Sequence, residues 1–511
     1  MTVPLSGCPD ALRYDLTPGM PSCFLAHDPA AVEVEGYWYK NFQYDEERQR
    51  GLEYLEDLFS PLMIKADLST HSHFSLVAST EPRTAANAPT YKYEESKRAA
   101  FAHYGKWAKY GGSDLVSILQ AAAEQFIVTR APRHTVLAGY HWFGDWGRDT
   151  MIALPGLLLA TDRPELALEI LLQFVRFIEG GMLPNRFPDS GEIPEHNTID
   201  ATLWFFEAIR QYYHYRKDIA WRNSALGVIR ESLYVPLKEI VAAHLSGTRY
   251  GIHVDQDGFL WAGDPTTNLT WMDAKVGDTA ITPRFGRPVE IQALWYNALS
   301  TLEEFGRLLD DLDGANSCAE WAAKLKGNFE STFWNETAGY LNDVVRVSEC
   351  DASLRPNQVF AVSLHYSLLS GQRARKVLDV IEQELLTPYG LRTLSSKDRQ
   401  YRGQYAGDVW SRDRAYHQGT VWPWLAGPFF SAKLEMAESY PLVLNEIENW
   451  LTGMACHLRA AGIGQISEIF DGDYLHNPRG CIAQAWSVSE MLRLAKIVMN
   501  HPLRRNDNHG K

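Results

Sequence analysis

A long series of segments with apolar residues at helical spacing is the feature that most constrains how this chain can fold. Within each segment the apolar residues recur every three or four positions, which is typical of amphipathic helices. The segments expected to form helices are 115–130, 150–161, 164–180, 197–216, 221–244, 288–310, 314–333, 356–370, 372–385, 415–434, 438–461 and 482–499. The loops between them are rich in Gly, Pro and Trp, and some far exceed the roughly two to eight residues usual in helical bundles.

About twelve helices joined by long loops favour a ring of helical hairpins. Six hairpins in a double ring bury the inner helices on all sides and gather the long loops at one end, where loops usually carry function. We therefore expect a mainly α fold, an (α/α)6 toroid. An irregular helical domain is the alternative, because periodicity alone does not set the order of helices in space.

The first part of the chain has a different pattern. Segments 32–39 and 74–79 alternate apolar and polar residues between turn signals, which predicts strands. We expect a partial β-rich N-terminal domain over residues 1–110 and the helical toroid over residues 111–511.

Charge and aromatic content limit the kinds of partner. The chain has 63 acidic and 49 basic residues, a formal net charge of −14, which argues against nucleic acid because phosphate backbones are held by basic surfaces. It shows neither a long apolar run nor a signal-peptide pattern, so we expect no membrane span and a cytoplasmic location. Sixteen Trp and 24 Tyr indicate a surface or cleft that stacks on rings, so a neutral ring-shaped ligand fits better.

One segment, HWFGDWGRDTMIALPG at 141–156, combines aromatic and ionisable residues directly before an apolar helical run. Trp142 and Trp146 offer flat apolar faces, whereas Arg148 and Asp149 offer a donor fork and an ionised acceptor. Together they suit a flat ring fringed with hydroxyls, which describes a sugar. The structural alternative is that Asp149 caps the helix and Arg148 pairs locally.

Carboxylates are the candidates for chemistry in this chain. It contains no Walker loop, no GxGxxG after a strand, no GxSxG, no HExxH and no metal-type cysteine spacing, so we expect no cofactor and no metal. Glycoside hydrolysis needs one protonated carboxyl and one ionised carboxylate. Asp273 follows apolar residues that can raise its pKa, and Glu468 lies in a short glycine-containing loop before a helix. Asp149, Asp200 and Glu290 compete with them on equal terms.

The same loops carry further residues suited to hydroxyl recognition and ring stacking. Asp200 and Trp204 are four apart on one predicted helix and therefore share a face. The candidate substrate-binding residues are Trp146, Arg148, Asp149, Asn197, Asp200, Trp204, Trp271, Glu290, His417, Gln418, Trp422 and Trp424. The alternatives are an aromatic core around His417 and a buried pairing of a carboxylate with an arginine.

Several of these segments together resemble one known family. The quoted segments are FGDWGRDTMIALPG, NTIDATLW, NLTWMDAK, PVEIQALWYNAL, LRPNQVFAVSL, LLTPYGLRTLS, YHQGTVWPW, GQISEIFDGD and RGCIAQAWSVSE. In content and order they resemble the amylo-α-1,6-glucosidase domain of glycogen debranching enzymes over about residues 115–499. Residues 35–82 are similar to the end of the β-sandwich that precedes this domain in bacterial members.

The resemblance implies an (α/α)6 catalytic domain that hydrolyses α-1,6-glucosidic branch linkages of glycogen or similar glucans with inversion. It implies that Asp273 is the general acid and Glu468 the general base. It also implies that Trp146, Arg148 and Asp149 bind the terminal glucose. The expected partner is an α-glucan such as glycogen or a branched dextrin, and the sequence predicts no oligomeric state.

The chain differs from the family pattern in two ways, and two alternative functions are compatible with the sequence. From its length we expect the chain to lack the 4-α-glucanotransferase domain of eukaryotic members, and we expect its N-terminal region to lack much of the bacterial sandwich. One alternative is another inverting glucosidase or trehalase-like hydrolase on the same toroid, since a fold does not set the linkage cleaved. The other is a non-catalytic glucan-binding protein, which a lack of glucose release from branched dextrins would favour.

Overall fold

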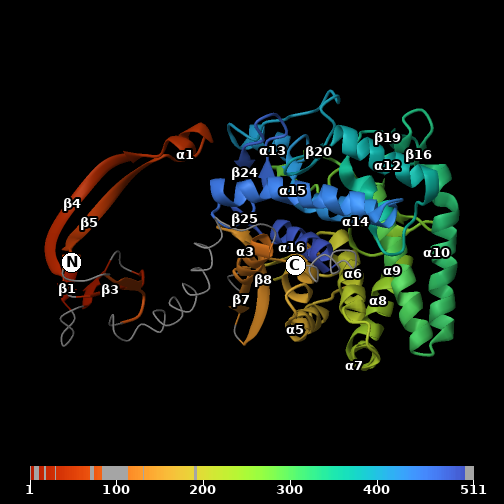
Figure 1. Ribbon diagram of the computed structural model, residues 1–511, viewed down its shortest axis with the longest axis horizontal. Helices are drawn as coiled ribbons and strands as arrows, with labels where there is room; N and C mark the ends of the chain where they lie inside the picture. Colours follow the sequence, from red (N-terminus) through yellow and green to blue (C-terminus); the bar gives the residue numbers. More distant parts are fainter. Residues whose placement is uncertain are drawn as a thin grey trace, which may run out of the picture. The chain divides into compact units, whose positions relative to one another are not determined.

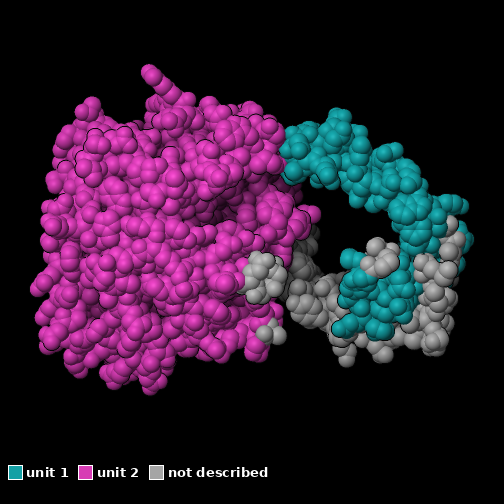
Figure 2. Space-filling model, turned by 180° about the vertical axis from the view of Figure 1, so that it is seen from behind, with its two compact units in different colours: residues 1–110 teal, residues 111–511 magenta. Residues whose placement is uncertain are grey.

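The computed structural model describes residues 2–4, 11–15, 19–28, 30–69, 74–82, 113–130, 132–188 and 193–500. Residue contacts divide the chain into two compact units, Met1–Tyr110 and Gly111–Lys511, which Figure 2 colours separately. The predicted boundary at 110–111 falls between described residues 82 and 113, outside the described part of the chain.

The N-terminal unit is built from antiparallel strands. A four-stranded sheet has the order β1 (Thr2–Pro4), β2 (Ala11–Tyr14), β3 (Cys23–His27) and β6 (Leu76–Ser79). A long hairpin pairs β4 (Ala31–Gln43) with β5 (Leu55–Lys65), and the short helix α1 (Asp45–Gln49) lies between these strands in sequence. The predicted β-rich region is therefore confirmed.

An inner ring of helices forms the centre of the second unit, and most of its members are labelled in Figure 1. Each helix of the ring contacts the next, and the last contacts the first, so the ring closes. In ring order these helices are α4 (Gly147–Leu154), α6 (Asp200–His214), α9 (Val289–Leu308), α11 (Phe360–Ser363), α14 (Ala426–Glu435) and α16 (Ala485–Asn500). Every residue of α4 is buried, as expected for a helix surrounded on all sides.

A second set of helices packs around the ring. Its members are α3 (Ser113–Glu124), α5 (Pro164–Val175), α7 (Ile219–Val228), α8 (Tyr234–Ser246), α10 (Leu312–Phe333), α12 (Gly371–Glu384) and α15 (Tyr440–Ala460). In α12 the buried residues are Ala374, Val377, Leu378 and Ile381, a single stripe at helical spacing with exposed residues opposite. The double ring confirms the predicted (α/α)6 toroid.

Short strands occupy the loops between the helices. One sheet has the order β10 (Arg186–Phe187), β9 (Phe143–Trp146), β8 (Arg133–Tyr140) and β25 (Ala483–Gln484), with β7 (Ile127–Arg130) also on β8. Another has the order β20 (Leu386–Thr387), β21 (Gly390–Arg392), β22 (Val421–Trp422), β23 (Ile469–Phe470) and β24 (Pro478–Arg479). A third joins β15 (Arg287–Pro288), β18 (Val344–Val345) and β19 (Cys350–Asp351). The remaining pairs are β11 (His253–Val254) with β12 (Leu260–Trp261), β13 (Lys275–Val276) with β14 (Thr279–Ala280), and β16 (Trp334–Asn335) with β17 (Tyr340–Leu341).

Three predicted helices differ most from the structure. The helix expected over 115–130 ends at Glu124, and its last residues form β7. The helix expected over 356–370 is a 3-10 turn followed only by α11. The helix expected over 415–434 is divided into α13 (Val409–Tyr416), β22 and α14, because Gly419 takes a left-handed φ of +146° and Pro423 begins a new helical turn.

Four inner helices follow directly on short strands, with β9 before α4, β15 before α9, β22 before the turn that leads into α14, and β25 before α16. The long loops therefore gather where the inner helices begin. Among the helices of the described residues, none is both long enough and apolar enough to cross a membrane.

Candidate active site

The candidate site lies where the inner helices of the ring begin. Asp149 is in the first turn of α4, Asp200 is the first residue of α6, and Gln484 directly precedes α16. The N-terminal end of a helix carries a partial positive charge, which stabilises a carboxylate placed there by about 0.3–1 kcal/mol. The ring thus brings together acidic residues that are far apart in the sequence.

Arg148 connects three separate segments of the chain. Its Nε donates to Oδ1 of Asp200 over 2.8 Å, and its Nη1 donates to Oδ2 of Asp273 over 2.9 Å. Its Nη2 donates to Oγ1 of Thr198 over 2.9 Å. A guanidinium group has five N–H donors in a planar fork, so this side chain fixes both carboxylates and keeps further donors.

The carboxyl group of Asp149 lies within the electrostatic field of this cluster. Burial raises its pKa to about 7; the charge of Arg148 opposes that rise, and the charges of Asp273, Glu468 and Asp200 add to it. The amide Nε2 of Gln484 donates to Asp149 Oδ1 over 3.2 Å. Four carboxyl groups therefore interact at one end of the toroid.

Glu468 is held from both sides. The phenol of Tyr416 donates to its Oε1, and the backbone N–H of Cys481 donates to its Oε2 over 2.9 Å. Burial raises the pKa of Glu468 to about 7, while the bonds from Tyr416 and Cys481 lower it. A carboxyl with this pKa is poised to accept a proton near neutral pH.

Gly480 allows Glu468 to take this position. Its φ is +66°, and a Cβ atom at this residue would lie only 2.2 Å from Glu468 Oε2. Any side chain at position 480 would therefore displace the carboxylate, in addition to straining the backbone.

Asp273 is the most accessible of the four carboxylates. Its side chain is 30% exposed, whereas Glu468 is only 2% exposed. Burial raises its pKa, and the ion pair with Arg148 opposes that rise. The side-chain amide of Asn268 donates to the backbone oxygens of Asp273 and Ala274, over 3.1 and 3.0 Å, which holds the loop in shape.

The predicted aromatic residues lie mainly in the interior. Trp271, Trp422 and Trp424 pack edge to face, with ring centroids of Trp271 at 5.2 Å from Trp422 and 5.4 Å from Trp424. His417 stacks on Trp422 at 5.3 Å, and Trp204 meets Trp424 at 6.5 Å. All five are buried. Their arrangement matches the aromatic core that was the alternative to direct ring stacking on a substrate.

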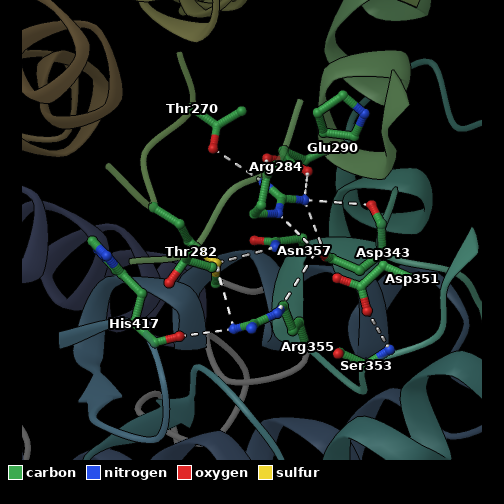
Figure 3. A network of polar contacts seen from close by, with 12 residues as sticks. Thr270, Thr282, Arg284, Glu290, Asp343, Asp351, Ser353, Arg355, Asn357 and His417 are labelled. Atoms are coloured by element: carbon green, nitrogen blue, oxygen red, sulfur yellow. Dashed lines mark hydrogen bonds and ion pairs between the residues drawn. The ribbon is translucent and has the colours of Figure 1, made fainter. Parts of the chain in front are cut away.

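Glu290, predicted as a substrate ligand, is bound by an arginine inside the protein. Both of its carboxylate oxygens accept from Arg284, which also donates to Asp343 Oδ2 over 2.7 Å (Figure 3). Arg284 Nη1 further donates to Thr270 Oγ1 over 3.2 Å. Glu290 is 1% exposed, so its oxygens are used inside the protein, behind the loop that carries Asp273.

Gln418 is buried beside the same network. Its Oε1 accepts from Arg355 Nη2 over 2.8 Å, and its Nε2 donates to Thr282 Oγ1 over 3.2 Å. Arg355 also donates to the backbone oxygen of His417 over 2.7 Å (Figure 3). The segment 417–418 is thereby anchored next to Tyr416.

Two predicted residues lie apart from these interactions. Trp146 is half-buried at the end of β9 and meets Phe143 edge to face at 6.2 Å. Asn197 is exposed, and its side chain bonds to Asn185 and Glu195.

Sequence reasoning missed Tyr416, Thr198 and Gln484. Each stands in a segment that was singled out: Tyr416 directly before His417, Thr198 two residues before Asp200, and Gln484 in the segment RGCIAQAW. Nothing in the sequence indicates which carboxylate each side chain meets. Within the described ranges, His, Cys, Asp and Glu residues form no group of three that could hold a metal ion.

A helical double ring with interacting carboxyl groups at one end is the architecture of the (α/α)6 glycoside hydrolases. The chain belongs to the amylo-alpha-1,6-glucosidase family, whose model matches residues 121–493. A second model, glycogen debranching enzyme N terminal, matches residues 6–75.

Among curated proteins, the glycogen debranching enzyme of Saccharomyces cerevisiae is 27% identical over 368 residues, covering 56% of this chain. The match spans 24% of the yeast protein, so the chain covers about a quarter of that relative.

Two solved structures show the same fold. A bacterial glucoamylase complexed with acarbose has a TM-score of 0.61 at 14% identity, with 96% of this chain and 73% of that chain covered. The GH63 mannosylglycerate hydrolase of Thermus thermophilus has a TM-score of 0.54 at 14% identity, with 75% and 99% covered.

Proposed function

We propose that this chain hydrolyses α-1,6-glucosidic branch linkages of glycogen or a similar α-glucan, with inversion at the anomeric carbon. The observation that carries the proposal is that an accessible Asp273 interacts electrostatically with a buried Glu468 whose pKa is about 7. Membership of the amylo-alpha-1,6-glucosidase family supports the linkage. We also propose a cytoplasmic location, as expected from the sequence.

In this proposal Asp273 is the general acid and Glu468 the general base. Asp273 gives its proton to the glycosidic oxygen as the bond from that oxygen to the anomeric carbon breaks. Glu468 takes a proton from a water molecule that attacks the anomeric carbon from the opposite face. The products are a shortened glucan and glucose of inverted configuration. The proton on Glu468 then returns to solvent, and Asp273 takes up a proton from solvent.

Arg148 and Asp149 bind the terminal glucose in this proposal, with Trp146 lining the pocket. Three of the N–H groups of Arg148 are used by Asp200, Asp273 and Thr198, which leaves donors for sugar hydroxyls. The same ion pair orients Asp273.

The buried predicted residues have a supporting role in this proposal. The Nε1–H of Trp271 donates to Asn357 Oδ1 over 2.8 Å. The side-chain amide of Asn357 in turn donates to Asp343 Oδ1, which belongs to the network around Glu290. The network and the aromatic core of Trp204, Trp422, Trp424 and His417 thus hold the loop of Asp273 from behind.

The linkage is tested by incubating the purified protein with an α-1,6-branched limit dextrin and with a linear α-1,4 glucan. The released sugar and its anomer are followed by NMR. We expect β-glucose as the first product, from the branched substrate only. Release from the linear glucan at a similar rate would contradict the linkage, and initial α-glucose would contradict inversion.

The role of Asp273 is tested with Asp273→Asn, which keeps the shape of the side chain and removes the proton that it donates. Turnover should fall by about 10²–10⁴-fold while substrate still binds, the usual value of general acid–base assistance. Asp313→Asn, at an exposed position in the first turn of α10, is the matched control and should leave turnover unchanged. Near-normal turnover of Asp273→Asn would remove Asp273 from this role.

A further inference from the structure

Three arginine side chains line a pocket outside the carboxylate cluster. The pocket has a volume of about 250 Å³ and is lined by Ile281, Arg399, Gln400, Arg402, Arg414 and Gln418. Arg399 and Arg402 belong to the loop between β21 and α13, and Arg414 belongs to α13. Gln418 lines the pocket on its buried side, whereas the three arginines are exposed at the surface.

The positive charge of this pocket is not compensated. Its lining contains no carboxylate, and none of its three guanidinium groups forms an ion pair with the residues that the structure describes. Elsewhere in this unit, Arg148, Arg284 and Arg287 all pair with carboxylates. In a chain with a formal net charge of −14, three unpaired arginines around one hollow concentrate the opposite charge at a single place.

Two of the three arginines, Arg402 and Arg414, contact the structure around them. The Arg402 backbone N–H donates to the Gln418 carbonyl over 2.6 Å, and its Nη1 donates to the Tyr401 carbonyl over 2.9 Å. The guanidinium of Arg414 lies 5.7 Å from the centre of the Trp410 ring. These contacts use few of the guanidinium N–H groups, so most of those donors are available to an anion.

The pocket adjoins the segments that carry the candidate catalytic residues. Ile281 donates its backbone N–H over 3.0 Å to the oxygen of Ala274, the residue after Asp273. Arg414 lies two residues before Tyr416, which bonds to Glu468. A ligand in this pocket is therefore next to both loops of the candidate site.

We propose that this pocket binds a phosphate group carried by a sugar. Guanidinium groups recognise phosphate by paired N–H bonds, and three of them match an anion with several acceptor oxygens. The sugar part follows from the shared loops and rests on the proposed function, whereas the phosphate part rests on the arginines alone. The phosphate is either an ester on the glucan itself or part of a free sugar phosphate.

Calorimetric titration with glucose 6-phosphate, inorganic phosphate and glucose tests the phosphate part. Arg402→Gln and Arg414→Gln should each weaken glucose 6-phosphate binding by about 10–100-fold, the usual value of a hydrogen bond to a charged group. Glucose binding should be unchanged in both variants. Arg230→Gln, which removes the charge of an exposed arginine outside this pocket, is the matched control and should bind as the parent does.

Two results overturn the proposal. One is that the parent binds glucose 6-phosphate and inorganic phosphate no more tightly than glucose. The other is that both pocket variants bind glucose 6-phosphate as tightly as Arg230→Gln does. Thermal unfolding of each variant shows whether a loss of binding comes from a loss of fold.

A second arm separates the two sources of phosphate. Glucose release is measured from a phosphorylated branched dextrin before and after treatment with phosphatase. If the ester on the glucan is the source, the pocket variants should lower kcat/KM on the phosphorylated dextrin alone. If a free sugar phosphate is the source, the pocket variants should bind glucose 6-phosphate more weakly in the titration and keep the kcat/KM of the parent on both dextrins. If the proposed function is wrong, neither dextrin should release glucose. The titration would still test phosphate binding in that case, because it does not depend on glucose release.

Discussion

Replacing Tyr416 by phenylalanine removes the hydroxyl that donates to Glu468 Oε1. This hydrogen bond stabilises the ionised carboxylate, so its loss raises the pKa of Glu468 further above its present value of about 7. A hydrogen bond to a charged group contributes about 1.5–3 kcal/mol, and one pKa unit corresponds to about 1.4 kcal/mol. The acidic limb of the pH profile should therefore move to higher pH by about one to two pH units.

The assay is kcat/KM for glucose release from a branched dextrin, measured from pH 5 to pH 9. If Glu468 is the base, activity of Tyr416→Phe should be lost most at low pH and recover toward high pH. The ring should stay in place through its contacts with Trp422 and His417, at 5.1 and 4.8 Å.

Tyr389→Phe is the matched control, because the Tyr389 ring stacks on Phe470, two residues after Glu468, at 4.5 Å. Tyr389→Phe should leave the acidic limb of the pH profile at the same pH as in the parent protein. An unmoved limb in Tyr416→Phe, or an equal loss at every pH, would refute the reasoning.

Three further predictions concern stability and the position of the base. The pKa of Glu468 is about 7 in the folded protein, compared with an ordinary value of 4.5. Its contribution to the free energy of unfolding is therefore fully present below pH 4.5 and is lost as the pH rises through 7. Glu468→Gln should thus be more stable than the parent above pH 7, by about 3 kcal/mol at most, with no difference below pH 4.5 in denaturant titrations. Arg284→Met leaves the buried carboxylate of Glu290 without its ion pair and that of Asp343 with only the longer one, to Arg355 Nε at 3.7 Å, and should lower the free energy of unfolding by about 3–5 kcal/mol in calorimetry. A loss no larger than that of the surface variant Arg230→Gln would contradict this. Gly480→Ala pushes a Cβ atom against Glu468 and should cut kcat by about 10²-fold, whereas Gly277→Ala, which also has a positive φ but open space, should not. Equal losses in the two glycine variants would show that backbone strain alone is responsible.

Periodicity was a good guide wherever a helix has one apolar stripe. The segments predicted at 314–333 and 372–385 correspond closely to α10 and α12, both outer helices with a single buried face. The prediction of a single helix over 415–434 was wrong. There the chain turns at Gly419 so that Tyr416 and the loop before α14 face the candidate site, a long-range contact that a local pattern does not report.

The candidate site was only partly predictable for a related reason. Asp149, Asp200, Asp273 and Glu468 were all named from the sequence, and the structure brings these four into one electrostatic cluster. Glu290 was named with them on equal terms, yet its oxygens are taken by Arg284. The residue type is the same in each case, so only the neighbours distinguish them.

By itself, the sequence predicted most of the helices that build the toroid and the group of acidic and aromatic residues from which a site is built, because helical spacing and residue chemistry are local properties. The tertiary structure alone decided which carboxyl is exposed, which is paired and which has a raised pKa. Burial and charge act through space, and the residues that set the pKa of Glu468, among them Asp273 and Tyr416, lie far from it along the chain. The same holds for the three arginines, whose common pocket appears only when the loop before α13 is folded against Gln418.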